Sequence, residues 1–472
     1  MKRFLRKMSA LLVAMAMIMA MCMTVSAEGV APSSADKATI KVTNVEDGAT
    51  VTAYQIVAPE YNSNGLCGYK CVSPYVISDT VNFIPTPDEI TTIAGQVSGN
   101  GISLTGNKAN GYTASVGAGE YIVIITSTNY IYNPMVVSAA YTDANDKNSL
   151  ANSYVDASTD WKLNGATVFA KSSMVEINKT VSEPDAEVGK TVSYEITGTI
   201  PSYSAEYTNP TYKIIDTISN LAYETDTNGN KIEPQVKIGG VIATKGTDYT
   251  LEWNTNGFVV TFLNIGNYAG STNDARSVSI TYNAVVLASA STTDPATNTA
   301  DLEYSNNPND TAHAEEKITR TYTFDLTDEF TKVDENGSPL AGATFTLYRS
   351  DRSEFGTCTT EVVDDQATIH FEDLEAGTYY LKETAAPEGY SLNNTEYTIV
   401  IAAEYDENGT LKSHTITIDN LEAGNKVEVP NTTLSELPST GGIGTYVFTI
   451  VGVVLMAAAA GILFIKRRRS AE

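Results

Sequence analysis

Thr50-Val-Thr-Ala-Tyr-Gln-Ile-Val57 mixes β-branched, aromatic and polar residues in a short alternating run, and Tyr397-Thr-Ile-Val-Ile401 repeats the pattern much later in the chain. Clusters of Gly, Asn and Asp separate such runs through the middle of the sequence. β-Branched and aromatic side chains suit a pleated surface, and short strands between regular turn signals are typical of antiparallel sandwiches. The sequence therefore predicts an all-β fold of tandem immunoglobulin-like β-sandwich domains, with a short helix near Pro87 to Val97.

The first 27 residues have the pattern of a secretory signal peptide. Four cations lie within the first seven residues, an apolar run follows from Met8 to Met23, and Val25-Ser-Ala27 supplies small residues for cleavage. A buried core helix is the alternative, but a charged start followed by an uncapped apolar run fits export better. We expect residues 1–27 to be removed and the rest to be secreted.

The far end of the chain has an apolar segment of a second kind. An uncharged run from Ile443 to Ile465 is long enough to span a bilayer, and the four cations that begin at Lys466 favour a cytoplasmic tail. Directly before it lie Leu437, Pro438, Ser439, Thr440 and Gly441. Residues 437–472 thus resemble the LPXTG cell-wall sorting signal that sortases cleave, and the helix would hold only a transient membrane intermediate. An ordinary single-span membrane protein is the alternative.

The charge of the chain limits its partners. The full sequence carries a net charge of −26, and removing the eight cations and one anion of the two end segments leaves −33. Nucleic-acid binding requires basic patches, so the composition argues against it. A strongly acidic surface instead suits solubility outside the cell.

Three domains are expected between the end segments, because about 150 residues make a typical domain. We place an N-terminal β domain at residues 28–172, a middle β-sandwich at 173–323 and a C-terminal sandwich at 324–433. The second and third share a plan, since each opens with a strand that holds one inward-facing Lys and closes with a strand that ends in Asn. This is a weak internal repeat of pattern more than of identity.

Three polar residues of the C-terminal domain fall where apolar residues are expected. Side chains alternate between the two faces of a strand, so Lys332 shares a face with Phe330, Glu383 with Leu381, and Asn431 with the valines before it. A lone buried Lys would be very costly, which suggests that the three groups meet. A neutral amine, an amide and a protonated carboxyl are sufficient to form an isopeptide bond with loss of ammonia. The reaction occurs once per molecule and is self-modification, not turnover.

The sequence around these residues resembles a CnaB-type isopeptide domain. The likeness rests on FTKVDENGSPLAGATFTL (330–347), KETAAPEGY (382–390) and VPN (429–431) and covers essentially the whole C-terminal domain. It implies a bond between Lys332 and Asn431, with Glu383 as the catalytic acid. An ordinary sandwich with a surface Lys–Glu pair is the alternative.

The middle domain is similar to the middle domain of fimbrial major subunits and carries a second trio. Lys179 shares a face with Ile177, and Asp216 lies between Ile214 and Ile218 on one face of its strand. We assign a Lys179–Asn306 bond with Asp216 as the acid. Asn307, the next residue along the strand, is an alternative to Asn306 as the partner of Lys179, and Asn298 is a weaker alternative.

The N-terminal domain lacks such a trio. Lys41 falls on the opposite strand face from its apolar neighbours and is expected to face water. No internal cross-link is therefore predicted in this domain. After removal of the signal, three cysteines remain, which are too few for a disulfide framework. Cys67 and Cys71 could pair if a tight turn joined them. No third ligand for a metal lies nearby, so neither a metal nor a cofactor is expected.

One lysine is a candidate for joining subunits. In a pilin, the amine that attacks the sortase-held Thr440 belongs to a Lys of the next subunit, and the family's motif ends in Tyr-Pro-Lys. The sequence ATVFAK (166–171) stands at the corresponding place. Phe169 and Ala170 replace the Tyr and Pro, and Trp161 is one residue off the usual spacing. Lys171 is therefore the expected acceptor, and Lys162 is the nearest rival.

The combined features predict the major structural subunit of a sortase-assembled pilus, or fimbria, of a Gram-positive bacterium, located on the cell wall. Its expected partners are a sortase, identical subunits in a covalent homopolymer, other pilins and peptidoglycan. The alternative is a monomeric wall-anchored or pilus-tip adhesin that binds a host ligand. An enzyme is a third option, but the three histidines occur singly, without a Ser or Cys motif around them.

Overall fold

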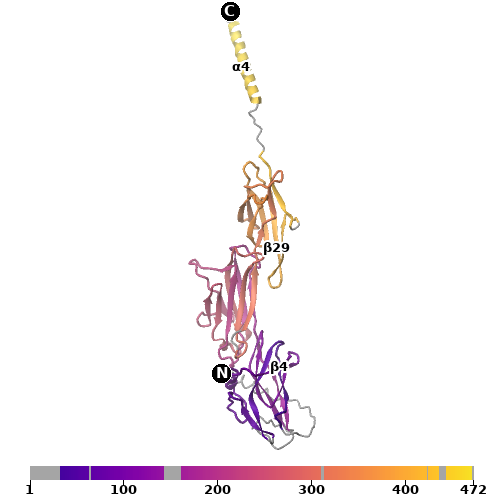
Figure 1. The fold of residues 1–472 in the computed structure, drawn as a ribbon. Coiled ribbons are helices and arrows are strands. Elements are labelled where there is room, and N and C mark those ends of the chain that lie inside the picture. The colour runs from indigo at the N-terminus through magenta and orange to yellow at the C-terminus, as the bar shows by residue number, and fades with distance from the viewer. Residues whose placement is uncertain are drawn as a thin grey trace. The chain divides into compact units, whose positions relative to one another are not determined.

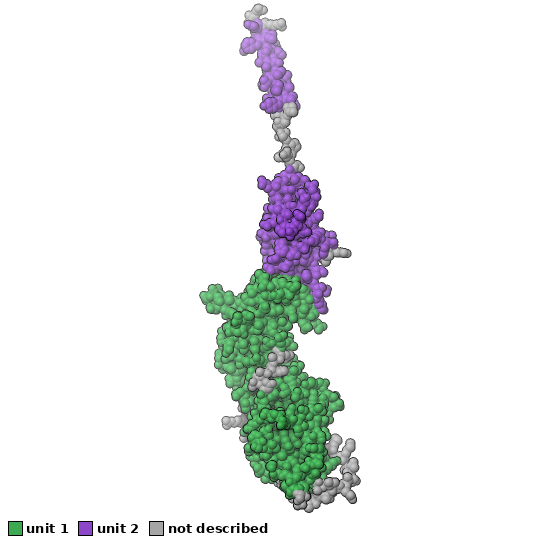
Figure 2. Space-filling view, viewed as in Figure 1, with its two compact units in different colours: residues 1–323, 405–411 green, residues 324–404, 412–472 purple. Residues whose placement is uncertain are grey.

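The computed structural model describes residues 32–62, 65–142, 161–309, 313–421, 424–434 and 443–469. These form two compact units, which are coloured separately in Figure 2. Unit 1 comprises residues 1–323 and 405–411, and unit 2 comprises residues 324–404 and 412–472. The signal segment 1–27 and the pentapeptide 437–441 lie outside the described residues. The predicted all-β architecture is confirmed (Figure 1).

The N-terminal part of unit 1 is one eleven-stranded system in the order β10-β1-β5-β4-β2-β6-β7-β11, in which β3 pairs with β2 and β8 joins β6 to β9. Its core is built from inward-facing aliphatic and tyrosine side chains of these strands. The strands are β1 (Ala38–Thr43), β2 (Thr50–Asn62), β3 (Gly65–Cys71), β4 (Ile102–Asn107), β5 (Gly111–Val116), β6 (Gly119–Thr126), β7 (Tyr130–Tyr132), β8 (Met135–Thr142), β9 (Lys162–Gly165), β10 (Thr167–Phe169) and β11 (Ser172–Met174).

The expected short helix is present as α2 (Pro87–Ala94). Thr86 caps it: its side chain accepts a hydrogen bond from the Glu89 amide, and the Glu89 side chain accepts one from the Thr86 amide. This reciprocal arrangement satisfies two amides that a helix start otherwise leaves unpaired, and Pro87 suits the first helical position.

The two cysteines that could have paired do not. Cys67 and Cys71 are free and lie on the same strand, β3, with no turn between them. Four residues of extended strand span about 13 Å, far beyond the 4.4–6.8 Å between Cα atoms that a disulfide allows. A disulfide between them is therefore ruled out by the fold.

The second part of unit 1 is a sandwich of two sheets. One sheet has the order β12-β13-β20-β16-β17 with β15 beside β20, and the other has the order β18-β19-β14-β21-β22. Phe258 of the second sheet packs edge-on against Tyr282 of the first, with ring centroids 5.1 Å apart. The elements are β12 (Ile177–Val181), β13 (Thr191–Thr199), β14 (Tyr212–Ser219), β15 (Leu221–Tyr223), β16 (Gln235–Ile238), β17 (Val241–Ile242), β18 (Tyr249–Trp253), β19 (Gly257–Phe262), η3 (Ile265–Tyr268), α3 (Asn273–Arg276), β20 (Ser277–Val286), β21 (Ala296–Tyr304) and β22 (His313–Thr321).

Unit 2 contains a third sandwich and the C-terminal helix. A five-stranded sheet has the order β26-β25-β28-β29-β30, and two strand pairs, β23–β27 and the parallel β24–β31, accompany it. The elements are β23 (Phe324–Leu326), β24 (Phe330–Asp334), β25 (Thr344–Arg349), β26 (Glu354–Thr359), β27 (Phe371–Leu374), β28 (Gly377–Ala385), β29 (Glu396–Tyr405), β30 (Leu411–Ile418), β31 (Val427–Asn431) and α4 (Ile443–Arg469). Within α4, the segment Tyr446–Arg468 is by length and composition able to cross a membrane.

Candidate functional site: two buried Lys–acid–Asn groups and an exposed lysine

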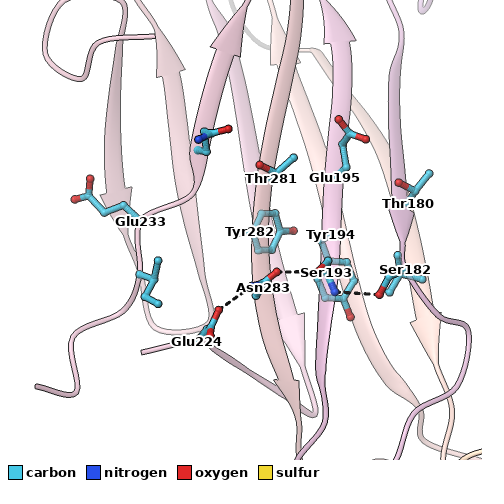
Figure 3. Close-up of a pocket in the computed structure, with 13 residues that line it drawn as sticks. Thr180, Ser182, Ser193, Tyr194, Glu195, Glu224, Glu233, Thr281, Tyr282 and Asn283 are labelled. Atoms are coloured by element: carbon cyan, nitrogen blue, oxygen red, sulfur yellow. Dashed lines mark hydrogen bonds between the residues drawn. The ribbon is translucent and has the colours of Figure 1, made fainter. Parts of the chain in front are cut away.

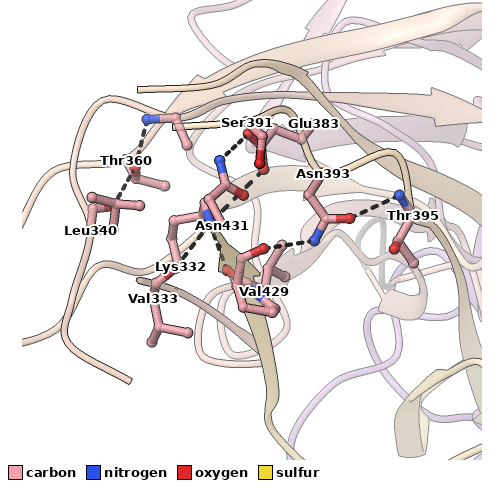
Figure 4. A network of polar contacts seen from close by, with 12 residues as sticks. Lys332, Val333, Leu340, Thr360, Glu383, Ser391, Asn393, Thr395, Val429 and Asn431 are labelled. Atoms are coloured by element: carbon pink, nitrogen blue, oxygen red, sulfur yellow. Dashed lines mark hydrogen bonds and ion pairs between the residues drawn. The ribbon is translucent and has the colours of Figure 1, made fainter. Parts of the chain in front are cut away.

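The C-terminal domain brings its predicted trio together. Lys332 on β24 and Asn431 on β31 lie on neighbouring parallel strands, where Lys332 is opposite Val429 and Asp334 is opposite Asn431. Glu383 reaches them from β28 of the five-stranded sheet, as Figure 4 shows. The side chains of all three are at most 1% exposed. Strand alternation thus placed each group on the inner face, as the sequence indicated.

The contacts in this group leave the reacting atoms available. Nδ2 of Asn431 donates to Oε1 of Glu383 at 2.6 Å, and Nζ of Lys332 lies 3.9 Å from Oε2 of Glu383. Nζ of Lys332 also donates to the backbone oxygens of Val429, at 2.7 Å, and of Val333, at 3.2 Å. Oδ1 of Asn431 has no hydrogen-bond partner among the described residues. The amide therefore has an acceptor that a protonated carboxyl can use.

Burial drives both ionisable groups of this trio towards their neutral forms. It lowers the pKa of the Lys332 amine and raises the pKa of the Glu383 carboxyl, because a charged group loses its hydration in an apolar interior. Each charge favours the ionised form of the other, but this opposing effect is the smaller one. A neutral amine and a protonated acid are the forms that amide formation needs.

The middle domain holds a comparable group between its two sheets. Nζ of Lys179, on β12, lies 2.5 Å from Oδ2 of Asp216, on β14, and both side chains are fully buried. The Tyr223 hydroxyl donates to Oδ1 of Asp216 at 2.5 Å, and the Tyr282 hydroxyl hydrogen-bonds Oδ2. Burial lowers the pKa of Lys179 here as well. The lysine and the acid of the predicted trio therefore do meet.

The asparagine of the middle group is not the one first assigned. Asn298 on β21 lies opposite Ile218, one diagonal step from Asp216, and its Nδ2 donates to the Tyr282 hydroxyl at 2.9 Å. Asn306 lies six residues beyond Ala300, the residue that faces Asp216, which places it about 20 Å further along the strand direction. The structure does not bring Asn306 to Lys179, whereas Asn298, the weaker rival, shares the Tyr282 hydroxyl with Lys179.

Asn306 and Asn307 instead lie where the middle β-sandwich contacts the N-terminal strands of unit 1. The Tyr207 hydroxyl donates to the backbone oxygens of Tyr132 and Asn306, at 3.0 and 3.3 Å. Nδ2 of Asn307 donates to the Thr126 hydroxyl at 3.0 Å. Their burial therefore follows from contacts with the N-terminal strands, which the sequence pattern of one strand could not reveal.

Lys171 is exposed in the short connection between β10 and β11. The backbone around it is fixed: the Ala170 amide donates to Thr43 O at 2.9 Å, and the Asn133 amide donates to Lys171 O at 3.1 Å. Lys162, the rival, is also exposed but lies within β9. Both lysines are exposed and both have a hydrogen-bonded backbone, so the difference is that Lys171 lies between two strands and Lys162 within one.

A groove on the middle domain is lined by polar residues of a different kind. It has a volume of about 540 Å³ and is lined mainly by the outward-facing polar residues of β12, β13 and β20 (Figure 3). Ser193 donates to Asn283, and Asn283 donates to Glu224, so these polar groups largely satisfy one another. Among the described residues, no group of three or more His, Cys, Asp or Glu side chains has the arrangement of a metal site.

Comparisons with known proteins agree with this architecture. Residues 35–172 match the T6 antigen Ig-like domain, residues 327–420 the prealbumin-like fold domain, and residues 429–472 the LPXTG cell wall anchor motif. The trypsin-resistant surface T6 protein of Streptococcus pyogenes serotype M6 is 28% identical, over 93% of this chain and 96% of that protein. Fimbrial subunit type 2 of Actinomyces naeslundii is 26% identical, over 64% of this chain and 62% of that protein.

The solved T6 backbone pilin of Streptococcus pyogenes supports the same fold. It superimposes with a TM-score of 0.64 at 24% identity, over 86% of this chain and all of that chain. The fold, the matched domains and the anchor motif define a wall-anchored surface protein built from immunoglobulin-like and prealbumin-like β domains.

Within that class the chain is a major pilus subunit of a Gram-positive bacterium, which forms a polymer with other pilin subunits and is attached to the cell wall. The relatives are structural pilins, which confirms the prediction of a structural protein over a surface enzyme.

Proposed function

We propose that the chain is the backbone subunit of a covalent, head-to-tail pilus that a sortase assembles through Thr440 and Lys171. The observation that carries this proposal is the placement of Lys171, whose side chain is exposed while hydrogen bonds to Thr43 and Asn133 hold the backbone on either side. An amine presented in this way is accessible to a bulky acyl-enzyme, whereas the buried Lys179 and Lys332 are not.

The joining reaction balances as two acyl transfers. The thiolate of the sortase attacks the Thr440 carbonyl, the Thr440–Gly441 amide breaks, and the C-terminal helix leaves with a free amine. The neutral amine of Lys171 from another subunit then attacks the thioester, releasing the thiol and forming an amide. The donor Thr440 and the acceptor Lys171 are different residues of the subunit, so the joint is heterologous and leaves both ends able to extend.

The same transfer ends on the wall when the attacking amine belongs to a peptidoglycan precursor. Other pilins that carry a suitable lysine or sorting signal would enter the fibre by the same chemistry. Host ligands would bind to the assembled fibre, and nothing in the joining reaction requires them.

Two internal isopeptide bonds stiffen each subunit in this proposal. In the C-terminal domain, neutral Lys332 attacks Cγ of Asn431 while protonated Glu383 donates to Oδ1; this requires the amide to turn half a revolution about its Cβ–Cγ bond from the orientation in Figure 4. The tetrahedral intermediate collapses with loss of ammonia. In the middle domain, Lys179 joins Asn298, and Asp216 is the acid.

Denaturing gels of wall extracts test the assembly. Arg keeps the charge of Lys171 but stays protonated and cannot act as the nucleophile. In cells that carry only Lys171→Arg, we expect the ladder of covalent polymers to disappear while the monomer is still exported and wall-anchored. Lys162→Arg is the matched control and should leave the ladder intact. A ladder that persists in Lys171→Arg and is lost in Lys162→Arg would assign the acceptor role to Lys162.

A further inference from the structure

We propose that the Tyr282 hydroxyl relays a proton from Lys179 to the leaving nitrogen of Asn298 when the middle-domain bond forms. The inference rests on the proposed Lys179–Asn298 bond and adds a catalytic residue to it. Tyr282 is a catalytic residue in the strict sense, because its hydroxyl touches the reacting atoms of both partners.

The hydroxyl lies at the centre of the buried group. Nζ of Lys179 donates to it at 2.6 Å, and Nδ2 of Asn298 donates to it at 2.9 Å. The hydroxyl donates its own proton to Oδ2 of Asp216. A single oxygen thus contacts the nucleophile, the acid and the leaving group.

Packing holds the Tyr282 ring in place. It stacks on Tyr194, its partner on β13, with centroids 5.6 Å apart, and Phe258 packs edge-on at 5.1 Å. The side chain is buried, and that burial raises its pKa well above the ordinary value. The phenol therefore stays protonated and always has a proton to pass on.

The proton balance of the reaction calls for such a group. When neutral Lys179 attacks Cγ of Asn298, its nitrogen gains a positive charge and must lose one proton. Nδ2 must gain one proton before it can leave as ammonia. Asp216, as the acid, donates a proton to the carbonyl oxygen Oδ1 of Asn298. The Tyr282 O–H first turns from Asp216 towards Nδ2. Tyr282 then accepts the proton from the Lys179 nitrogen and donates its own to Nδ2, so it ends the reaction unchanged.

The C-terminal trio is built differently and provides an internal control. Nζ of Lys332 is held by the backbone oxygens of Val429 and Val333. In the described part of the chain, no tyrosine hydroxyl hydrogen-bonds Lys332 or Asn431, and Glu383 alone contacts the Asn431 amide. A variant at position 282 should therefore affect one bond and not the other within the same molecule.

The test compares rates of bond formation in the full chain. Tyr282→Phe keeps the ring and removes the hydroxyl, and Tyr223→Phe removes the other hydroxyl that contacts Asp216 but does not contact Lys179 or Asn298. Each chain is made by cell-free synthesis and quenched at intervals, and tryptic peptides spanning each bond are quantified by mass spectrometry. We expect Tyr282→Phe to slow the middle-domain bond by about 100-fold, the lower range for general acid–base catalysis. Tyr223→Phe should have a much smaller effect, and the Lys332–Asn431 bond should form at the native rate in both.

Equal middle-domain rates in Tyr282→Phe and the native chain would overturn the relay and leave the proposed bond standing. Absence of the middle-domain bond from the native chain would instead overturn the bond and the relay together. If Tyr282→Phe fails to fold, 3-fluorotyrosine at position 282 keeps the ring and the hydroxyl but makes the hydroxyl more acidic. A relay then predicts a middle-domain rate different from the native one, and an unchanged rate contradicts it.

Discussion

Glu383 sits between an amine and an amide from which almost all water is excluded, so its protonation state decides what those neighbours can do. Burial raises the pKa of this carboxyl and lowers that of Lys332, which favours a neutral pair over an ion pair. An ion pair would be unreactive, because a protonated amine has no lone pair with which to attack. The self-reaction thus depends on the same desolvation that makes buried charges costly.

Replacing Glu383 by Gln should leave the domain folded but without its cross-link. Gln keeps the shape of the side chain and cannot supply the proton that the Asn431 carbonyl needs, so the bond should form at least about 100-fold more slowly. Intact mass spectrometry reports each bond as a loss of about 17 Da, the mass of one ammonia. Native protein should show two such losses and Glu383→Gln only one. The exposed neighbour Glu428→Gln should keep both; two losses in Glu383→Gln would refute the role of the acid.

Glu120 in the N-terminal domain gives a prediction about pH. It is 3% exposed, and burial, aided by the charge of Asp79, raises its pKa to about 8. Between the ordinary value near 4.5 and about 8, the folded state holds a proton that the unfolded state has released. The free energy of unfolding should therefore fall as pH rises through this window, by on the order of 3 kcal/mol.

Glu120→Gln should remove that pH dependence and should be more stable than the native chain at pH 8. Thermal melts at pH 5 and pH 8 provide the comparison. Glu252→Gln, at an exposed position of β18, is the control and should melt like the native chain at both values. A native melting temperature that stays constant between the two pH values would show that Glu120 is ionised in the folded state.

Individual residues were predictable where strand alternation alone placed them. Lys332, Glu383 and Asn431 each occupy an inner position in a run of apolar residues, and the fold brings them together. Asn298 was ranked below Asn306 because one strand's pattern gives the face but not the register against the next strand. Tyr282 was missed for a different reason: an inward-facing tyrosine looks like ordinary core until its hydroxyl is seen among polar partners.

At the scale of elements, the two expected cross-links constrain their sandwiches differently. Lys332 and Asn431 lie on the paired parallel strands β24 and β31, near the two ends of one domain, so their bond would close a loop of about 100 residues. Lys179 and Asn298 lie on strands of opposite sheets, so their bond would fasten one sheet to the other. Both bonds would prevent a domain from unfolding progressively from its ends.

Lys332→Met should show how much the Lys332–Asn431 bond contributes to the stability of its domain. Met fills the buried space without a nucleophile or a charge, so the variant loses the bond with little added packing cost. By analogy with disulfides, a loop of this length is worth up to about 4.7 kcal/mol, although the entropic account is debated. We expect a lower melting temperature and faster cleavage of this domain by trypsin. Lys412→Met, at an exposed position of β30, should match the native chain, and identical melting of all three would contradict a stabilising bond.

The kinds of element were predictable from the sequence, whereas their partners were not. Runs in which apolar and polar residues alternate form strands, and the Thr86–Glu89 pair marks the start of α2. Sheet membership depends on long-range pairing, such as the parallel contact of β1 with β10, which no local pattern specifies. The conditional pairing of Cys67 with Cys71 failed for this reason, because β3 is straight where a turn was required.

At the scale of the whole molecule, the two proposed kinds of covalent bond differ in the accessibility of their lysines. Lysines buried beside an acid and an asparagine would react within the chain, and a lysine exposed between two strands would react between chains. Tension on a fibre would then pass through amide bonds at each joint and across cross-linked sandwiches within each subunit. The end segments serve export and anchoring and would be absent from the finished fibre.

The most direct test of the central claim is mass spectrometry of the joint in purified native fibres. Proteolysis should release a branched peptide in which the Thr440 carboxyl is joined to the Lys171 side chain, with every residue from Gly441 onward missing from the donor. Tandem fragmentation would identify both ends of the bond. Recovery of this peptide as the predominant joint is the result we predict. Fibres whose Thr440 is joined mainly to a different lysine, or whose subunits separate in denaturant without any such peptide, would contradict the account.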